Sequence, residues 1–143
     1  MEEEVIIKIT GRQEFIHNGE KDKIEQVVTG RLFLKNDKYY LIYNDNSPGV
    51  DGAEAKLRID LKAEQLLLMR DDPAPLKQKF IEGEITDGYY GRVEQKFDIS
   101  VDTEKISLQA DMNSGEINVD YCLYFNRELT SENKLSIRYR TDN

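Results

Sequence analysis

Apolar and polar residues alternate one by one along much of this 143-residue chain. Between residues 117 and 125, one set of alternate positions holds Ile117, Val119, Tyr121, Leu123 and Phe125. The other set holds Asn118, Asp120, Cys122 and Tyr124. A helix would scatter the first set around its axis, whereas a pleated strand places all five side chains on one face. The pattern therefore predicts a half-buried β-strand.

The same alternation recurs in residues 5–10, 57–62, 97–102, 106–112 and 135–140. Residues 24–34 and 39–43 are apolar on both faces, which predicts strands that are central or covered. Turn-forming residues separate these runs, namely Asn18-Gly19, Asn36-Asp37, Asn46-Ser47-Pro48-Gly49, Asp87-Gly88 and Asn113-Ser114-Gly115. Residues 62–70 have high helix propensity, but their strand neighbours favour a turn followed by a strand.

About ten strands joined by short turns predict an all-β, antiparallel up-and-down meander. We expect one domain over residues 1–143, because the chain has the length of a single domain and contains no linker. An open sheet of this size would leave long edges exposed, and closure removes them. The first choice is therefore a β-barrel, and the second is a β-sandwich.

The acidic composition limits the partners of this chain. Its formal net charge is −8, which repels nucleic acid and acidic membrane surfaces. The longest apolar runs are far too short for a membrane-spanning helix, and the acidic start differs from a signal peptide. One cysteine and one histidine exclude ordinary structural zinc sites, and the lone thiol fits a reducing compartment. We therefore expect a cytoplasmic protein with no metal and no cofactor.

The stretch from Thr29 to Tyr43 resembles the opening hairpin of the YwiB-like proteins, which are small uncharacterised bacterial β-barrels with a calycin-like, or lipocalin-like, fold. The resemblance continues through Leu68-Met69-Arg70, residues 78–83, Tyr90, Thr103 and residues 115–121. It departs from the family pattern at Asp72 and at Glu94-Gln95. The resemblance implies a calycin-like barrel and carries no activity to this chain.

Six residues are candidates for a ligand site inside such a barrel: Arg70, Gln78, Phe80, Tyr90, Thr103 and Tyr121. Arg70 ends an apolar strand, where an inward guanidinium would bind a carboxylate or phosphate. The other five would line a mostly apolar cavity with a few polar anchors. In the plainer interpretation, Arg70 extends to water or pairs with a local acid, Phe80 and Tyr121 belong to the core, and Thr103 lies in a turn. Ala110 and Gly30 are the small residues that would open the interior.

The sequence predicts no catalytic group. Cys122 has Asp120 as a same-face neighbour, which disfavours a reactive thiolate, and no nucleophile or phosphate-loop motif is present. The favoured hypothesis is a non-enzymatic barrel that binds a small, partly apolar molecule, which would be anionic if Arg70 faces the lumen. The alternative is a filled barrel acting as a structural or protein-interaction module, through Tyr40 or Tyr124 or by forming a homodimer.

Overall fold

The computed structural model describes residues 1–142, so the end of the predicted domain, Asn143, lies outside the described residues. It contains ten β-strands and one short 3₁₀ turn, η1. The strands are β1 (Glu2–Phe15), β2 (Lys21–Lys35), β3 (Lys38–Asp45), β4 (Ala53–Asp60), β5 (Gln65–Arg70), β6 (Leu76–Ile81), β7 (Ile85–Tyr90), β8 (Phe97–Ala110), β9 (Ser114–Phe125) and β10 (Glu128–Thr141). The 3₁₀ turn spans Val93–Gln95.

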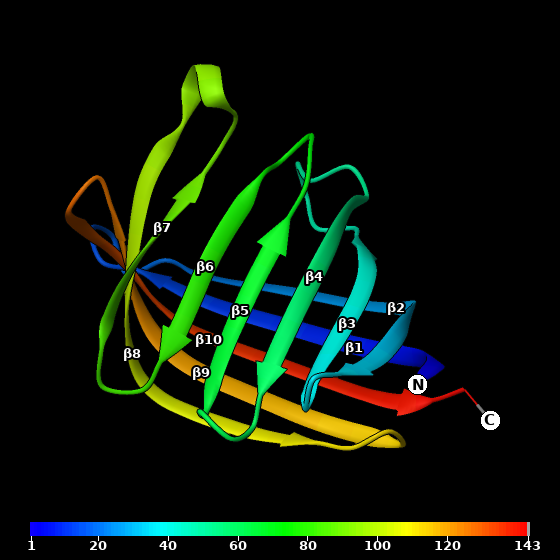
Figure 1. Ribbon diagram of the computed structural model, residues 1–143. Coiled ribbons are helices and arrows are strands. Elements are labelled where there is room, and N and C mark those ends of the chain that lie inside the picture. Colours follow the sequence, from blue (N-terminus) through cyan, green and yellow to red (C-terminus); the bar gives the residue numbers. More distant parts are fainter. Residues whose placement is uncertain (143) are drawn as a thin grey trace.

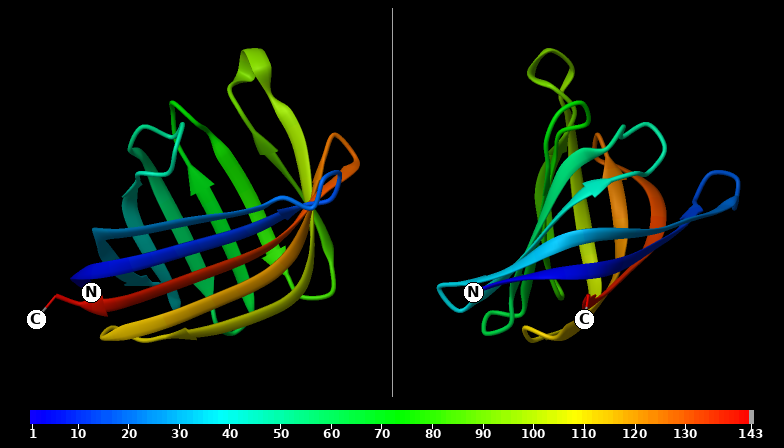
Figure 2. Two further views of the ribbon diagram at one scale, coloured as in Figure 1. Left: turned by 180° about the vertical axis from the view of Figure 1, so that it is seen from behind. Right: turned by 90° about the vertical axis from the view of Figure 1, so that its right-hand side faces the viewer.

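These strands form a closed antiparallel barrel in which sequence neighbours pair and β1 closes the ring against β10. The predicted up-and-down barrel is therefore confirmed. β1, β2, β8, β9 and β10 have 12 to 15 residues, whereas β3 to β7 have six to eight. The long strands form one wall and the short strands cross them as the other (Figures 1 and 2).

The alternation predicted from the sequence sets the inner face of each strand. Ile117 and Val119 are fully buried, and Tyr121, Leu123 and Phe125 follow on the same side. In β8 the inward positions change parity after a register shift between Thr103 and Lys105. A β-bulge of this kind adds one residue and bends the strand. The runs at 97–102 and 106–112 therefore belong mainly to one bulged strand.

Buried side chains fill the middle of the barrel. They include Leu32, Leu41, Leu57, Ile59, Leu66 and Ile137, each at most 1% exposed. Gly30 does not open this interior, because a Cβ there would meet the carbonyl oxygen of Ile42 and Cδ1 of Ile7. The prediction for Gly30 is therefore wrong, since the space beside it is occupied.

Two local predictions are also corrected. Asp87-Gly88 is not a turn but lies within β7, where Gly88 permits close approach of β6 at Lys77 and Gln78. Residues 24–34 are not covered throughout, since Val27 is 64% exposed. By contrast, Asn36 and Asp37 both have positive φ and form the predicted tight turn between β2 and β3. The turn and strand predicted over 62–70 are also observed, with β5 beginning at Gln65.

β2 and β8 extend beyond the strands β3 and β7 that pair with them. β3 pairs with β2 from Gly30 onwards, and β7 pairs with β8 up to Asp102. The barrel wall is thus incomplete beside residues 21–29 and beside residues 104–110, which opens the interior at two places. In the described part of the chain, no helix is long and apolar enough to cross a membrane.

Candidate functional site

Polar side chains replace the apolar core where β1 and β10 approach the first opening. Ser131 is fully buried and Asn133 is 9% exposed, and both belong to the inward-facing set of β10. Gln13 of β1 donates a hydrogen bond from Nε2 to Ser131 Oγ at 3.1 Å. Asn133 donates from Nδ2 to the same oxygen at 3.0 Å. Within residues 1–142, the carbonyl oxygens of these two amides accept no hydrogen bond, so the cluster is able to accept hydrogen bonds from a ligand.

Tyr121 of β9 joins this polar cluster to the apolar core. It pairs with Asn133 on one side and with Thr103 on the other. Its ring packs edge-on against Phe80 of β6, with 5.0 Å between the ring centroids. Burial raises the pKa of the Tyr121 hydroxyl to about 12, so it remains a neutral donor and acceptor at physiological pH.

A hollow of about 190 Å³ opens beside this ring, and we call it the Tyr121 hollow. It is lined by Gly11, Arg12, Gln13, Asp22, Ile24, Tyr121, Asn133, Lys134 and Leu135. Gly11 faces inward between Ile24 and Leu135, and a Cβ at Gly11 would meet nothing within 4 Å. A glycine inside a strand marks a bend or a place where another group approaches the backbone. Here it leaves apolar-walled space beside polar anchors.

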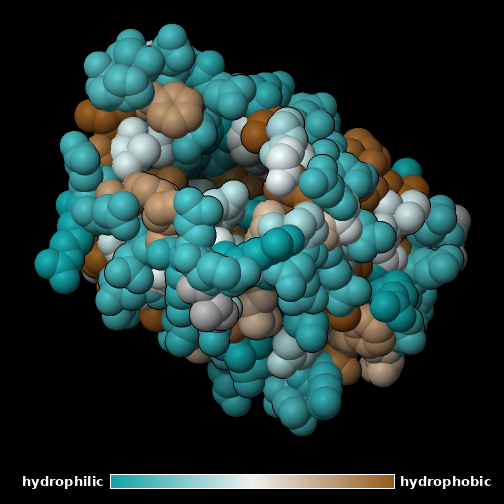
Figure 3. All heavy atoms as spheres, turned by 90° about the horizontal axis from the view of Figure 1, so that it is seen from above, coloured by the Kyte–Doolittle hydropathy of each residue, from teal (hydrophilic) through white to brown (hydrophobic). Residues whose placement is uncertain are grey.

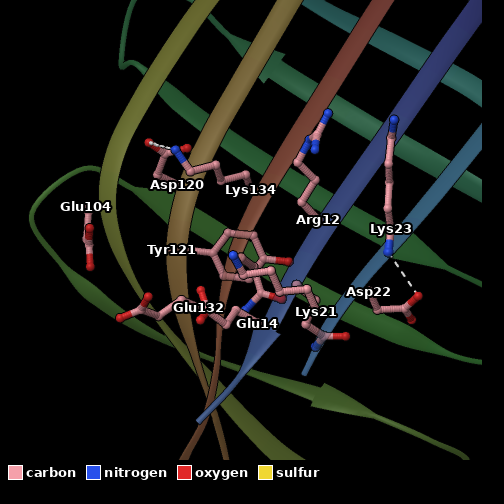
Figure 4. Close-up of a pocket in the computed structure, with 12 residues that line it drawn as sticks. Arg12, Glu14, Lys21, Asp22, Lys23, Glu104, Asp120, Tyr121, Glu132 and Lys134 are labelled. Carbon is pink, nitrogen blue, oxygen red and sulfur yellow. Dashed lines mark hydrogen bonds and ion pairs between the residues drawn. The ribbon is translucent and has the colours of Figure 1, made fainter. Parts of the chain in front are cut away.

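A larger hollow of about 490 Å³ adjoins it and shares Tyr121, Gln13 and Asn133 among its lining residues. We call it the charged hollow, because Arg12, Lys21, Lys23, Lys134, Glu14, Asp22, Glu104, Asp120 and Glu132 also line it. Figure 4 shows Tyr121 in the middle of these side chains, with Lys134 directed at Asp120. The two signs of charge are interspersed, so the hollow has no strong preference for an anion or a cation.

The space-filling view from above shows that the surface is hollowed and that apolar side chains are visible below a mostly hydrophilic rim (Figure 3). The combination of an apolar wall, a few polar groups and a concave surface is typical of small-molecule sites.

Arg70 occupies a different place, at the loop end of β5. Its Nη1 lies 3.4 Å from Asp45 Oδ2, and its Nε donates to the carbonyl oxygen of Ala74 at 2.7 Å. The guanidinium also lies over the ring of Tyr90, 5.9 Å from its centroid. Both charged side chains are only 11–12% exposed. Arg70 is therefore already neutralised by an internal partner, although this acid lies 25 residues away in the sequence and is not a local one.

Asp45 is the centre of this second polar group. Burial raises its pKa, but hydrogen bonds from Ser47 and Gln26, with the charge of Arg70, outweigh burial and leave the pKa below its ordinary value. Gln26 donates to Asp45 and Ser47 and accepts from the backbone N–H of Asn46. These contacts fasten the β3–β4 loop to β2.

Gln78 has a structural task between β6 and β7. These strands share only two register pairs, Leu76 with Tyr90 and Lys77 with Tyr89. Beyond them, Gln78 Nε2 donates to the carbonyl oxygens of Lys79 and Thr86 and to Thr86 Oγ1. The buried Gln78 Oε1 and Thr103 Oγ1 have no hydrogen-bond partner among the described residues. The side chain of Gln78 thus substitutes for missing ladder bonds.

The six predicted residues form two groups rather than one. Phe80, Thr103 and Tyr121 lie together beside the polar cluster, with Gln78 on the inner face of β6, while Arg70 and Tyr90 meet at the β5–β6 loop. Thr103 is a fully buried strand residue, not a turn residue. Whether any of them binds a ligand stays a prediction.

Residues 7–137 match the family described as "Domain of unknown function (DUF1934)". The chain belongs to the DUF1934 family. A relative from Bacillus subtilis (strain 168), "Uncharacterized beta-barrel protein YwiB", is 23% identical over 139 residues, which is 97% of this chain and 96% of that protein. The crystal structure of the ywiB protein from Bacillus subtilis has a TM-score of 0.83 and 20% identity, covering 99% of this chain and 94% of that chain. These findings confirm the predicted family and the barrel.

The DUF1934 match identifies no ligand for these hollows, and the barrel has a further hollow at its second opening. Leu61, Ile106, Leu108 and Ala110 line another hollow of about 330 Å³ at the second opening, together with Glu64, Glu82 and Gln109. Ala110 thus borders this hollow, and whether it opens the barrel interior stays a prediction. This hollow is lined by fewer inward polar groups than the Tyr121 hollow, because Glu64 and Glu82 are exposed.

Two further chemical features of this DUF1934 protein are the reactivity of Cys122 and the capacity to bind a metal ion. Burial raises the pKa of the Cys122 thiol to about 11, and the carboxylates of Glu104, Glu132 and Asp102 act in the same direction. The sequence argument invoked Asp120, whereas Glu104 receives the thiol hydrogen bond. Within residues 1–142, no three His, Cys, Asp or Glu side chains cluster in a way that could hold a metal ion.

Sequence reasoning missed Gly11, Gln13, Ile24 and Asn133 in the candidate site. Gly11 carried a signal, because it interrupts an otherwise strand-like run. Gln13 and Asn133 share the parity of the inward apolar residues in their own strands, but only the pairing of β1 with β10 shows that they lie together.

Proposed function

We propose that this protein is a non-enzymatic binding protein whose ligand is a small, uncharged, partly apolar molecule held in the Tyr121 hollow. One observation carries the proposal: the inward-facing Gly11 leaves open space between the apolar side chains of Ile24 and Leu135. A strand interior ordinarily favours a residue with a side chain, and glycine there costs about 0.5–1 kcal/mol relative to alanine.

The polar groups around this space support recognition of a ligand hydroxyl or carbonyl. Tyr121 stays protonated because its pKa is about 12, and the amides of Gln13 and Asn133 keep their carbonyl oxygens unengaged by Ser131. Polar groups of this kind fix the orientation of a ligand in an otherwise apolar site.

An uncharged ligand is favoured over an anionic one. The cation that would attract an anion, Arg70, is paired with Asp45 and lies in the other polar group. The charges around the charged hollow are mixed, and the chain as a whole has a net charge of −8. The same acidity disfavours nucleic acid and acidic membranes as partners. With its single thiol, the composition also supports a cytoplasmic location.

The protonated state of the Cys122 thiol supports the proposal that the protein is not an enzyme. The Cys122 thiol has a pKa near 11 and is surrounded by carboxylates, so little of it is thiolate at neutral pH.

The substitution Gly11→Leu tests the proposal, because a Cβ at this position meets nothing within 4 Å and the rest of the leucine side chain would extend into the hollow. The protein is purified from its own host and compared by native and denaturing mass spectrometry. We expect a non-covalent adduct on the wild-type protein in native spectra, its loss in denaturing spectra, and its absence from Gly11→Leu.

Ser107→Leu serves as a matched control, because it introduces the same side chain at an exposed position on the outer face of β8. The adduct is expected to persist in this variant. A wild-type protein free of any adduct, or an adduct retained by Gly11→Leu, would contradict binding in the Tyr121 hollow.

A further inference from the structure

The second opening in the barrel wall holds the hollow of about 330 Å³ beside β8, which we call the β8 hollow. It lies where β7 stops pairing with β8 at Asp102, and it is bounded by the turn from β4 to β5 and the turn from β6 to β7. Figure 1 shows both turns at the lower end of the short strands, where β8 runs past them. The volume of this hollow is within the range of small-molecule sites.

The wall of the β8 hollow is apolar. Ile106, Leu108 and Ala110 lie on the inward-facing side of β8, and Leu61 lines the hollow with them from the β4–β5 turn. All four side chains are partly buried and pack against the barrel core. β7 does not cover this part of β8, because its pairing ends at Asp102. The wall therefore offers an apolar surface to the body of a ligand.

The charged groups that line this hollow have one sign. They are the carboxylates of Glu64 and Glu82, and no Lys, Arg or His is among the residues within 1–142 that line it. Neither carboxylate forms an ion pair in the described part of the chain. The charged hollow differs, because bases and acids line it together. A concave surface lined by carboxylates alone, in a chain of net charge −8, attracts cations and repels anions.

Backbone oxygen atoms add to the acceptors at the edge of β8. Glu82 Oε1 accepts a hydrogen bond from the backbone N–H of Ile106 at 2.9 Å, and Oε2 accepts none within residues 1–142. Because this N–H is not bonded to β9, Ile106 and Val119 are a non-hydrogen-bonded pair of the ladder, and so are Leu108 and Ile117. The carbonyl oxygens of Ile106 and Leu108 therefore point away from β9, towards the side that β7 leaves open.

We propose that the β8 hollow binds a small primary amine, with its ammonium group at the carboxylates of Glu64 and Glu82 and its apolar body against the β8 wall. An ammonium group has three N–H donors and no acceptor, so carboxylate and carbonyl oxygens are its natural partners. A neutral alcohol of the same shape lacks the charge attraction, and a carboxylate of the same shape is repelled.

This site does not depend on the proposed function, because the β8 hollow and the Tyr121 hollow share no lining residue. The two hollows also differ in ligand class, since the Tyr121 hollow is proposed to bind an uncharged molecule. The two proposals can therefore fail separately.

A methyl NMR titration of the wild-type protein tests the proposal with three probes of similar shape. Benzylamine carries the ammonium group at pH 7, benzyl alcohol is neutral and benzoate is an anion, and all three are added at one ionic strength. We expect saturable shifts at the methyl groups of Leu61, Ile106, Leu108 and Ala110 with benzylamine. The Kd for benzylamine is expected to be about tenfold lower than the Kd for benzyl alcohol, and benzoate is expected to cause no saturable shift at these groups.

The double variant Glu64→Gln with Glu82→Gln removes both charges, and the amide oxygen at position 82 can still accept the hydrogen bond from Ile106. We expect its benzylamine Kd to rise about tenfold and to approach that of benzyl alcohol. The matched control is Glu20→Gln with Glu128→Gln, which makes the same change of net charge at two exposed residues outside the hollow. The control is expected to bind benzylamine like the wild-type protein.

Three results would overturn the proposal. They are the absence of saturable benzylamine shifts at the β8 wall, equal Kd values for benzylamine and benzyl alcohol, and a benzylamine Kd that changes equally in the two double variants. None of them bears on the Tyr121 hollow, whose occupancy is reported by the methyl groups of Ile24 and Leu135.

Discussion

Asp45 holds together the group of polar residues that closes the loop end of the barrel. It accepts hydrogen bonds from Gln26 and from the backbone N–H of Ser47, and it pairs with Arg70 at 3.4 Å. These interactions leave its pKa below the ordinary value of 3.8 despite burial. The carboxylate therefore stabilises the folded state only while it is ionised.

The substitution Asp45→Asn is expected to lower the free energy of unfolding at pH 7 by about 3 kcal/mol, because Arg70 then lacks its buried partner. In the wild-type protein this contribution is complete above pH 3.8 and is lost as the pH falls through the folded-state pKa. Urea unfolding between pH 7 and pH 2.5 checks this. The difference between the two proteins should shrink at the acidic end, and an unchanged difference would contradict the assignment.

At the scale of the element, the contact between β6 and β7 is the weakest in the ring, because it has two register pairs and depends on the side chain of Gln78. Gly88 permits this arrangement. A Cβ at Gly88 would collide with the carbonyl oxygen of Lys77 and with Gln78 Oε1.

We predict that Gly88→Ala lowers the free energy of unfolding by about 1–3 kcal/mol through this collision. Gly11→Ala is the matched control, because it makes the same change inside a strand where the added Cβ meets open space. It should be neutral or stabilising by up to about 1 kcal/mol. Urea unfolding measures both, and hydrogen exchange should show faster exchange of the β7 amides in Gly88→Ala alone. Equal effects of the two variants would contradict this account of the β6–β7 contact.

The strands were predictable because the inner face of each strand follows from the alternation of its own residues, as between Ile117 and Phe125. The bulge in β8 was also readable in principle, since the apolar parity changes between Val101 and Ile106. Asp87-Gly88 was misread because a glycine needed for close approach has the same sequence signature as a turn. Half of β2 was misread because its apolar residues gave no sign that β3 is shorter.

At the scale of the whole molecule, the packing of the barrel interior determines where a ligand can bind. The middle of the barrel is filled by side chains such as Leu57 and Ile117, and the hollows lie where the wall is incomplete. Phe80, Thr103 and Tyr121 were named as candidates from the sequence, and the structure places them together. The separation of Arg70 and its pairing with Asp45, 25 residues away, depends on strand register that no local pattern encodes.

The most direct test of binding at the Tyr121 hollow is a methyl NMR titration of the wild-type protein and Gly11→Leu with phenol, a small, neutral and partly apolar probe. Saturable shifts are expected at the methyl groups of Ile24 and Leu135, and they should be absent from Gly11→Leu. Shifts confined to other methyl groups such as those of Leu61 and Leu108, or equal shifts in both proteins, would contradict the account.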